Sequence, residues 1–217
     1  MPTCAVPSAT ARSVDRPRKR RRGWALRSLS PIVGALALAA CASSSSSPVV
    51  GGTDYAPQYD FSEFYAATNG RTFRVIVAGN PFPEMAPQEM QQRLLPMMQA
   101  NRPRPQLTFT YAVPAELPRP DYRLVLVFDA ANDLTAERVC ANEIRLKPRM
   151  PEGAGRFAVF AVYCRNDQWL SQTTASTPAT SPEDPRVGQL FSQLFLVLFS
   201  DSPMIRRSRF PIFVPMH

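Results

Sequence analysis

Three regularly spaced acidic residues offer the clearest catalytic option in this sequence. Asp129, Asp133 and Glu137 follow one another at intervals of four, which on a helix would place their carboxyl groups on one face. Such carboxylates can serve as general acid and base at a glycosidic bond, or bind a hard cation. A structural interpretation also fits, because Asn132 and Asp133 are typical caps for a short helix starting at Leu134. The run therefore predicts either an acidic site or a solvated helix start.

Other catalytic systems lack the residues that they need. The sole histidine is His217, which removes the usual general base, the histidine-activated nucleophiles and a histidine-based zinc site. Lys147 stands between Leu146 and Pro148, which is not typical of a buried Schiff-base lysine. No glycine-rich phosphate loop is present. The sequence predicts no metal ion and no cofactor, and we assign no catalytic residue from it.

The first 40 residues have the composition of an export signal. A basic stretch, Arg16–Arg22 with Arg27, precedes an apolar run over residues 29–40 that is too short to cross a bilayer. The run ends in Leu38-Ala39-Ala40-Cys41, which places one aliphatic and two small residues before a cysteine.

Residues 16–41 resemble the signal peptide of a bacterial lipoprotein. The resemblance implies that a diacylglyceryl group is attached to the sulfur of Cys41 and that cleavage falls between Ala40 and Cys41. Ala42, in place of an aspartate after the cysteine, implies an outer-membrane anchor with the domain facing the periplasm. An ordinary cleaved signal is the alternative. The segment Arg21-Arg22-Gly23-Trp24 also resembles a twin-arginine export motif, so the export route stays open.

The positive charge of the chain belongs to this leader. The formal net charge is +8, from 25 Lys+Arg and 17 Asp+Glu. Eight of those basic residues and one acidic residue lie in residues 1–40, which leaves 17 basic and 16 acidic residues from Cys41 onward. A near-neutral domain has no electrostatic footprint for nucleic acid, so we expect no nucleic-acid partner.

Two cysteines remain once the leader is removed and Cys41 carries the lipid. Cys140 and Cys164 form an even pair in an oxidising compartment, which predicts a structural disulfide. A redox-active pair would have a close CxxC spacing, which this pair lacks. A hairpin between Cys140–Leu146 and Phe157–Cys164 would set the two cysteines opposite each other. A loop that bears Cys140 and is stapled to the second strand is equally compatible.

The chain divides into a leader (1–40), a lipidated cysteine with a Ser-rich flexible tether (41–53), and a single domain (54–217). Hydrophobic patterns predict four strands and two helices within the domain. The strands are expected at residues 73–78, 107–113, 122–128 and 157–164, and the helices at 85–100 and 185–199. The order indicates an α+β fold, with a mostly antiparallel or mixed sheet of 4–5 strands and two main helices packed on one face.

Three details refine these elements. The apolar stripe of the first helix contains methionines, typical of core filler, and Pro96 should kink or shorten that helix. Asp184 and Pro185 have the types expected at the N-cap and first position of the second helix. Gln168–Pro182 is polar and rich in Ser and Thr, which favours a surface loop.

Aromatic residues supply the candidate binding surfaces. Phe61, Phe64 and Tyr65 share one helical face, near Tyr55 and Tyr59, and fit either a packed helix or an aromatic platform for glycans.

Two other groups combine charged and aromatic residues. Asp167 and Trp169 could meet a sugar, or could be a turn acid beside a packing tryptophan. The C-terminal tail fits either contact with anionic envelope polymers or a solvated tail with docked aromatics. Its relevant residues are Arg206, Arg207, Arg209, Phe210 and Phe213.

These observations lead to two hypotheses about function. The first is a membrane-anchored envelope lipoprotein that acts as a non-enzymatic binding or accessory module, with an envelope protein or polymer as partner. The second is a carboxylate-dependent hydrolase of envelope glycans, which requires a cleft where Asp129, Asp133 or Asp167 meet.

Overall fold

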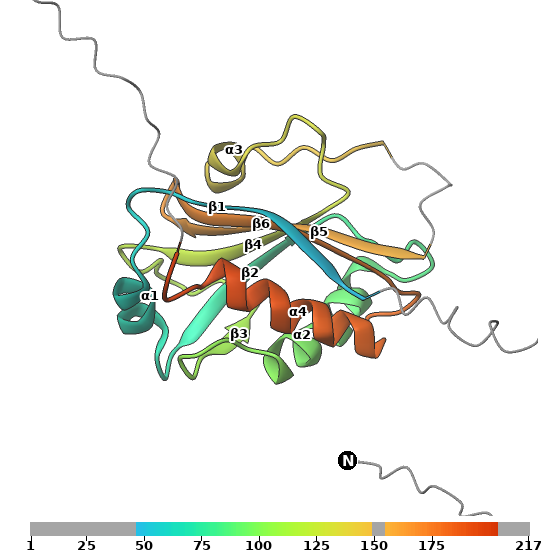
Figure 1. The fold of residues 1–217 in the computed structure, drawn as a ribbon, viewed down its shortest axis with the longest axis horizontal. Helices are drawn as coiled ribbons and strands as arrows, with labels where there is room; N and C mark the ends of the chain where they lie inside the picture. Colours follow the sequence, from blue (N-terminus) through green and yellow to red (C-terminus); the bar gives the residue numbers. More distant parts are fainter. Residues whose placement is uncertain (1–46, 149–154, 204–217) are drawn as a thin grey trace, which may run out of the picture. The chain divides into compact units, whose positions relative to one another are not determined.

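A computed structural model of the chain describes residues 47–148 and 155–203 (Figure 1). The leader, Cys41 and the arginine-containing tail all lie outside the described residues. The strands are β1 (Val49–Tyr55), β2 (Thr72–Ala78), β3 (Thr108–Thr110), β4 (Tyr122–Phe128), β5 (Arg156–Arg165) and β6 (Gln168–Pro178). The helices are α1 (Phe61–Thr68), α2 (Pro87–Ala100), α3 (Ala136–Cys140) and α4 (Pro185–Leu198).

The strands form one mixed sheet in the order β1-β6-β5-β4-β2-β3. The pairs β2–β3 and β2–β4 are parallel, whereas β4–β5, β5–β6 and β6–β1 are antiparallel. The α+β class and the mixed sheet are confirmed, but the sheet has six strands in place of the expected 4–5. The described chain also has four helices, of which α1, α2 and α4 lie on one face of the sheet and α3 on the other (Figure 1).

The main core lies between the sheet and the three helices of the first face. The methionine stripe of α2 belongs to this core, since Met90, Leu94 and Met98 are fully buried. Pro96 does not shorten α2, which continues to Ala100. Because Pro96 has no N–H, the Gln92 carbonyl lacks its usual helical donor. Both residues lie on the exposed side of α2, where water can donate a hydrogen bond to that carbonyl.

The helix caps follow the sequence closely at α4. Asp184 is the N-cap, and its side chain accepts a hydrogen bond from the backbone N–H of Arg186 at 2.9 Å. Pro185 occupies the first helical position, as its fixed φ and missing N–H favour. Both assignments from the sequence are confirmed.

The predicted surface loop over residues 168–182 is wrong, because most of it is the longest strand. β6 spans 11 residues between β1 and β5. Its residues facing α4 are small or β-branched, and Ser171, Thr173, Ala175 and Thr177 are all buried. The hydroxyl of Ser171 donates to the carbonyl of Leu198 at 2.6 Å, which satisfies a polar group at the end of α4.

Two strand boundaries also differ from expectation. The strand expected over residues 107–113 is limited to Thr108–Thr110, and Val113 is exposed. The segment predicted as a tether overlaps the sheet at its end, because β1 begins at Val49. β1 therefore adds an edge strand that the low-complexity composition of this segment did not indicate.

The predicted hairpin between residues 140–146 and 157–164 is wrong. β5 pairs with β4 and β6, and Cys140 is the last residue of α3. The structure nevertheless contains the Cys140–Cys164 disulfide, with a Cα–Cα distance of 5.6 Å. It joins α3 to β5, close to the alternative in which a connecting segment is stapled to the strand. Helix α3 starts two residues later than expected, with Thr135 in place of Asn132 or Asp133 as its N-cap.

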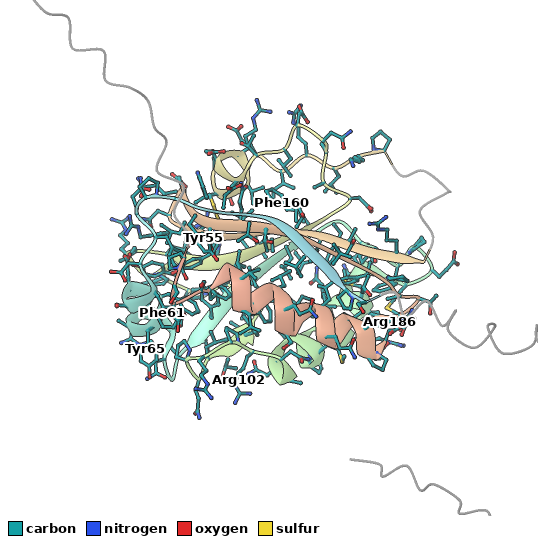
Figure 2. The ribbon with its side chains drawn as sticks, viewed as in Figure 1. Tyr55, Phe61, Tyr65, Arg102, Phe160 and Arg186 are labelled. Atoms are coloured by element: carbon teal, nitrogen blue, oxygen red, sulfur yellow. A yellow bond between two sulfur atoms is a disulfide. The ribbon has the colours of Figure 1, made fainter. Side chains whose placement is uncertain are left out.

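The aromatic segment around α1 packs mainly into the core. Phe64 is fully buried, stacks on Phe199 at a ring distance of 4.3 Å, and meets the edge of Tyr163 at 5.5 Å. Tyr59 is also buried, whereas Tyr65 is exposed at the outer side of α1 (Figure 2). The packing alternative therefore describes the inner residues of this segment.

Replacing both cysteines of the disulfide with alanine should lower the free energy of unfolding by about 3.5 kcal/mol. The bridge closes a loop between positions 24 apart, which limits the entropy of the unfolded chain. Urea unfolding of the wild type and the Cys140→Ala/Cys164→Ala variant measures the loss. Added reductant should destabilise the wild type and leave the double variant unchanged. Equal stability of the two proteins would contradict a bridging role.

Alkaline pH should unfold the domain through its tyrosines. Burial is the main cause that raises the pKa of Tyr55, Tyr59, Tyr111, Tyr122 and Tyr163 above the ordinary value of 10.0. The unfolded chain loses these protons first. The stabilisation is therefore complete below pH 10.0 and declines as the pH rises toward the folded-state pKa values, such as that of Tyr122, about 12.

Two spectra recorded along one pH titration measure this effect. Tyrosinate absorbance should rise together with the loss of the circular dichroism signal of the fold. In urea, the same absorbance should rise near pH 10 without a structural transition. Ionisation of these tyrosines near pH 10 in the folded protein would show that their burial is not as described.

Candidate functional site

The three acidic residues chosen for their spacing do not share a helical face. Asp129 directly follows β4, and α3 begins only at Ala136, so Asp129 and Asp133 lie outside the helix. Asp133 is exposed and forms an ion pair with the exposed Arg145. Glu137 is exposed in the first turn of α3, where a negative charge stabilises the helix start. The prediction of a joint acidic face is therefore wrong.

Asp167 lies far from Asp129. Asp167 is in the turn between β5 and β6, beside the start of β4, because Tyr122 pairs with Arg165. Asp129 follows the other end of the seven-residue β4, about 20 Å away along the strand. Trp169 is partly buried against the core cluster that contains the disulfide, as expected of a packing tryptophan. Asp129 lines an open groove at one end of β4, whereas Asp167 lines a cavity at the other end, so the described structure does not bring the two carboxylates together as the hydrolase hypothesis requires.

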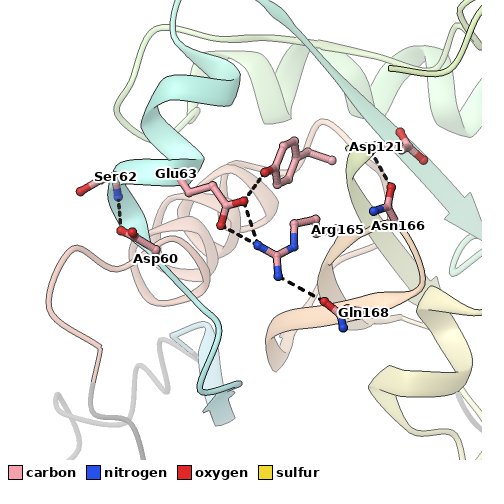
Figure 3. Close-up of polar contacts among 8 residues, drawn as sticks. Asp60, Ser62, Glu63, Asp121, Arg165, Asn166 and Gln168 are labelled. Atoms are coloured by element: carbon pink, nitrogen blue, oxygen red, sulfur yellow. Dashed lines mark hydrogen bonds and ion pairs between the residues drawn. The ribbon is translucent and has the colours of Figure 1, made fainter. Parts of the chain in front are cut away.

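A polar network instead joins α1 to the sheet near the start of β4 (Figure 3). Arg165 donates two hydrogen bonds to the carboxylate of Glu63, at 2.8 and 2.9 Å. The hydroxyl of Tyr122 donates to the same carboxylate. Arg165 also donates to the side-chain oxygen of Gln168 at 3.2 Å. No local sequence pattern indicates this network, because its members are brought together only by the packing of α1 against β4 and β5.

The chemistry of this network is that of a structural clamp. Burial, followed by the hydrogen bond to Glu63, raises the pKa of Tyr122 to about 12, so its phenol stays protonated at neutral pH. The hydrogen bond to Glu63 also raises the pKa of Arg165. Since the carboxylate is already engaged by both partners, Glu63 is poorly placed to accept a substrate proton. The network holds α1 in position and offers no activated group.

Two arginines and one aspartate form a second polar cluster on the other face of the sheet. Arg123 is buried, and its guanidinium donates to Asp121 at 2.9 Å and to the carbonyl of Cys140 at 2.6 Å. Arg74 lies 3.6 Å from the same Asp121 carboxylate. Arg123 therefore ties β4 to the end of α3. The sequence signal for this cluster is a charged residue at the start of a strand whose apolar run begins at Leu124.

The same face of the sheet has an open groove at the far end of β4. Helix α3 and its flanking loops cover this face only in part and leave a groove of about 650 Å³. Two rows of paired residues line its floor, and they are Val49, Ser176 and Ala158 in one row and Gly51, Thr174 and Phe160 in the other. Figure 2 shows Phe160 on the α3 side of the sheet. A Cβ atom added at Gly51 would meet no heavy atom within 4 Å, so the space above β1 is open.

Within residues 47–148 and 155–203, no three His, Cys, Asp or Glu residues gather closely enough to hold a metal ion. Among the helices in the same ranges, none combines the length and apolar character needed to cross a membrane.

The chain was compared with protein families, with curated proteins and with solved structures, and only solved structures gave matches. No protein-family model matches the chain, and no curated protein matches it either. Among solved structures, the chain is similar to the PelC dodecamer from Paraburkholderia phytofirmans, at 10% identity and a TM-score of 0.34. The match covers 70% of this chain and 96% of that chain.

Proposed function

We propose that this chain is a lipid-anchored envelope protein whose domain binds a protein partner and carries out no catalysis. The lipobox-like Leu38-Ala39-Ala40-Cys41 supports the anchor, with the lipid on Cys41 and cleavage after Ala40. Ala42 supports an outer-membrane location facing the periplasm. The near-neutral charge from Cys41 onward argues against nucleic acid as the partner.

The open groove is the observation that carries the binding role. One face of the sheet is covered by three helices, whereas the other leaves Val49 65% exposed and Phe160 only partly covered. Apolar side chains in an open groove of this size are typical of a binding surface.

The partner that fits this surface is an extended polypeptide segment. β1 is an edge of the described sheet and pairs on one side with β6. An added strand would gain backbone hydrogen bonds along the free side of β1 and place apolar side chains beside Val49, at the edge of the groove whose floor includes Phe160. A soluble polymer without a peptide backbone would not gain these bonds, so we favour a protein partner.

The anchor is tested by Cys41→Ser. This change removes the sulfur that would carry the lipid, so lipid labelling should be lost and the domain should move to the soluble fraction. Metabolic labelling with a lipid precursor and cell fractionation measure both effects. Cys4→Ser is the matched control, because Cys4 lies in the leader, and it should change neither result. Labelling and membrane retention that persist in Cys41→Ser would overturn the proposed anchor.

The groove is tested by photo-crosslinking in living cells. A crosslinking amino acid at Val49 or Phe160 should give a protein adduct of one defined mass. Leu196 is the matched control, because it is an apolar residue that is 70% exposed on α4, on the opposite face of the sheet. Val49→Asp should weaken the Phe160 adduct, since it places a charge on the floor of the groove. The same adduct from Leu196, or none from the groove, would contradict the proposal.

A further inference from the structure

A second cavity lies at the end of the sheet where β4 begins. Its volume is about 680 Å³, and its depth is lined by Arg74, Asp121 and Arg123. Arg74 and Arg123 pair directly in the parallel register of β2 and β4, so their side chains share one face of the sheet. The seven residues of β4 separate this cavity from the groove of the proposed function. The two sites are therefore independent.

The deep part of this cavity contains an excess of positive charge. The side chains of Arg74, Arg123 and Asp121 are only 15%, 3% and 12% exposed. One carboxylate thus faces two guanidinium groups, and Asp121 is closer to Arg123 (2.9 Å) than to Arg74 (3.6 Å). Because charges removed from water are costly unless they are paired, a second anion beside Arg74 would be stabilised here.

Both arginines have N–H groups that donate no hydrogen bond to a described residue. The two terminal nitrogens of Arg123 donate to Asp121 and to the Cys140 carbonyl, but its buried Nε has no hydrogen-bond partner in the described structure. Arg74 contacts Asp121 only at ion-pair distance, and no described residue accepts a hydrogen bond from its guanidinium. A guanidinium with free donors matches the two oxygens of a carboxylate.

The rim of the cavity favours a single negative charge together with hydroxyl groups. Glu116 and Asp167 are exposed acids at the rim, against one exposed cation, Arg119. This balance disfavours ligands with several negative charges. Asn142 and Asn166 also line the cavity. The side-chain oxygen of Asn166 accepts a hydrogen bond from the backbone N–H of Asp121 at 2.9 Å (Figure 3). The amide N–H groups of both asparagines can donate to hydroxyl oxygens.

We infer that this cavity binds a small hydroxylated carboxylic acid of the uronic-acid class. The carboxylate lies against Arg74 in the depth, and the hydroxyls meet the amides of Asn142 and Asn166. The volume suits a ligand of one or two sugar units.

The test is a titration of the purified full-length protein with glucuronate, followed by ligand-observed NMR. Binding should saturate, and Arg74→Gln should weaken it by about tenfold or more, because it removes a charge-assisted hydrogen-bond pair. Arg74→Lys keeps the charge without the fork and should give a smaller loss. Arg102→Gln is the matched control, because Arg102 is exposed and lines a different cavity, and it should bind like the wild type. Equal thermal unfolding midpoints show that the variants are folded.

Three further ligands test separately whether the carboxylate and the hydroxyl groups are recognised. Glucose lacks the carboxylate and should not bind, acetate lacks the hydroxyls and should bind more weakly than glucuronate, and phosphate should also bind more weakly. The site is overturned by the absence of saturable glucuronate binding up to about 10 mM, or by equal binding to wild type and Arg74→Gln. Equal affinity for acetate and glucuronate would overturn the uronic-acid class. If Arg74→Gln fails to fold, the comparison of Arg74→Lys with Arg102→Gln decides the question.

Discussion

The structure depends on the requirement that β4 be covered on both faces. Six of its seven residues are buried. On one face, Leu124 and Leu126 meet the core formed with α1, α2 and α4, and on the other Val125 meets the cluster around α3. Arg123 places a charge on this second face, where it donates to the Cys140 carbonyl while the disulfide holds the same residue to β5. The main core, the Cys140–Cys164 disulfide and the Arg74–Arg123 pair therefore all surround this one buried strand.

Much of this arrangement could be predicted from the sequence where the apolar pattern was strong. β2, β4, β5 and α4 were expected nearly at their observed bounds, since long apolar runs and the Asp184–Pro185 start are clear signals. β6 was missed because its buried side is built from Ser, Thr and Ala, which read as a loop by composition. β1 was missed because Gly and Ser near the predicted tether hid a strand that forms only by pairing with β6.

The polar sites were less predictable than the fold for a physical reason. Glu63, Tyr122 and Arg165 meet because α1 packs across the start of β4, and no local spacing encodes that contact. The regular spacing of Asp129 and Asp133 gave a misleading signal, because it suggested a shared helical face in a segment that is a loop. The disulfide was predicted correctly from cysteine count and compartment, although the hairpin offered as one route to it was wrong.

The early start of β1 has a mechanical consequence. Only eight positions separate Cys41 from Val49, so the chain between a lipid anchor and the sheet can span at most about 28 Å. In the proposed lipid-anchored form, a partner strand added along β1 would lie on the element that follows the anchor. Tension between membrane and partner would then load the bonds of β1 along the strand axis, with little force passing through the helical core. The hydrogen bonds between β1 and its neighbours would then be loaded in shear, parallel to the strand, rather than broken one after another from one end.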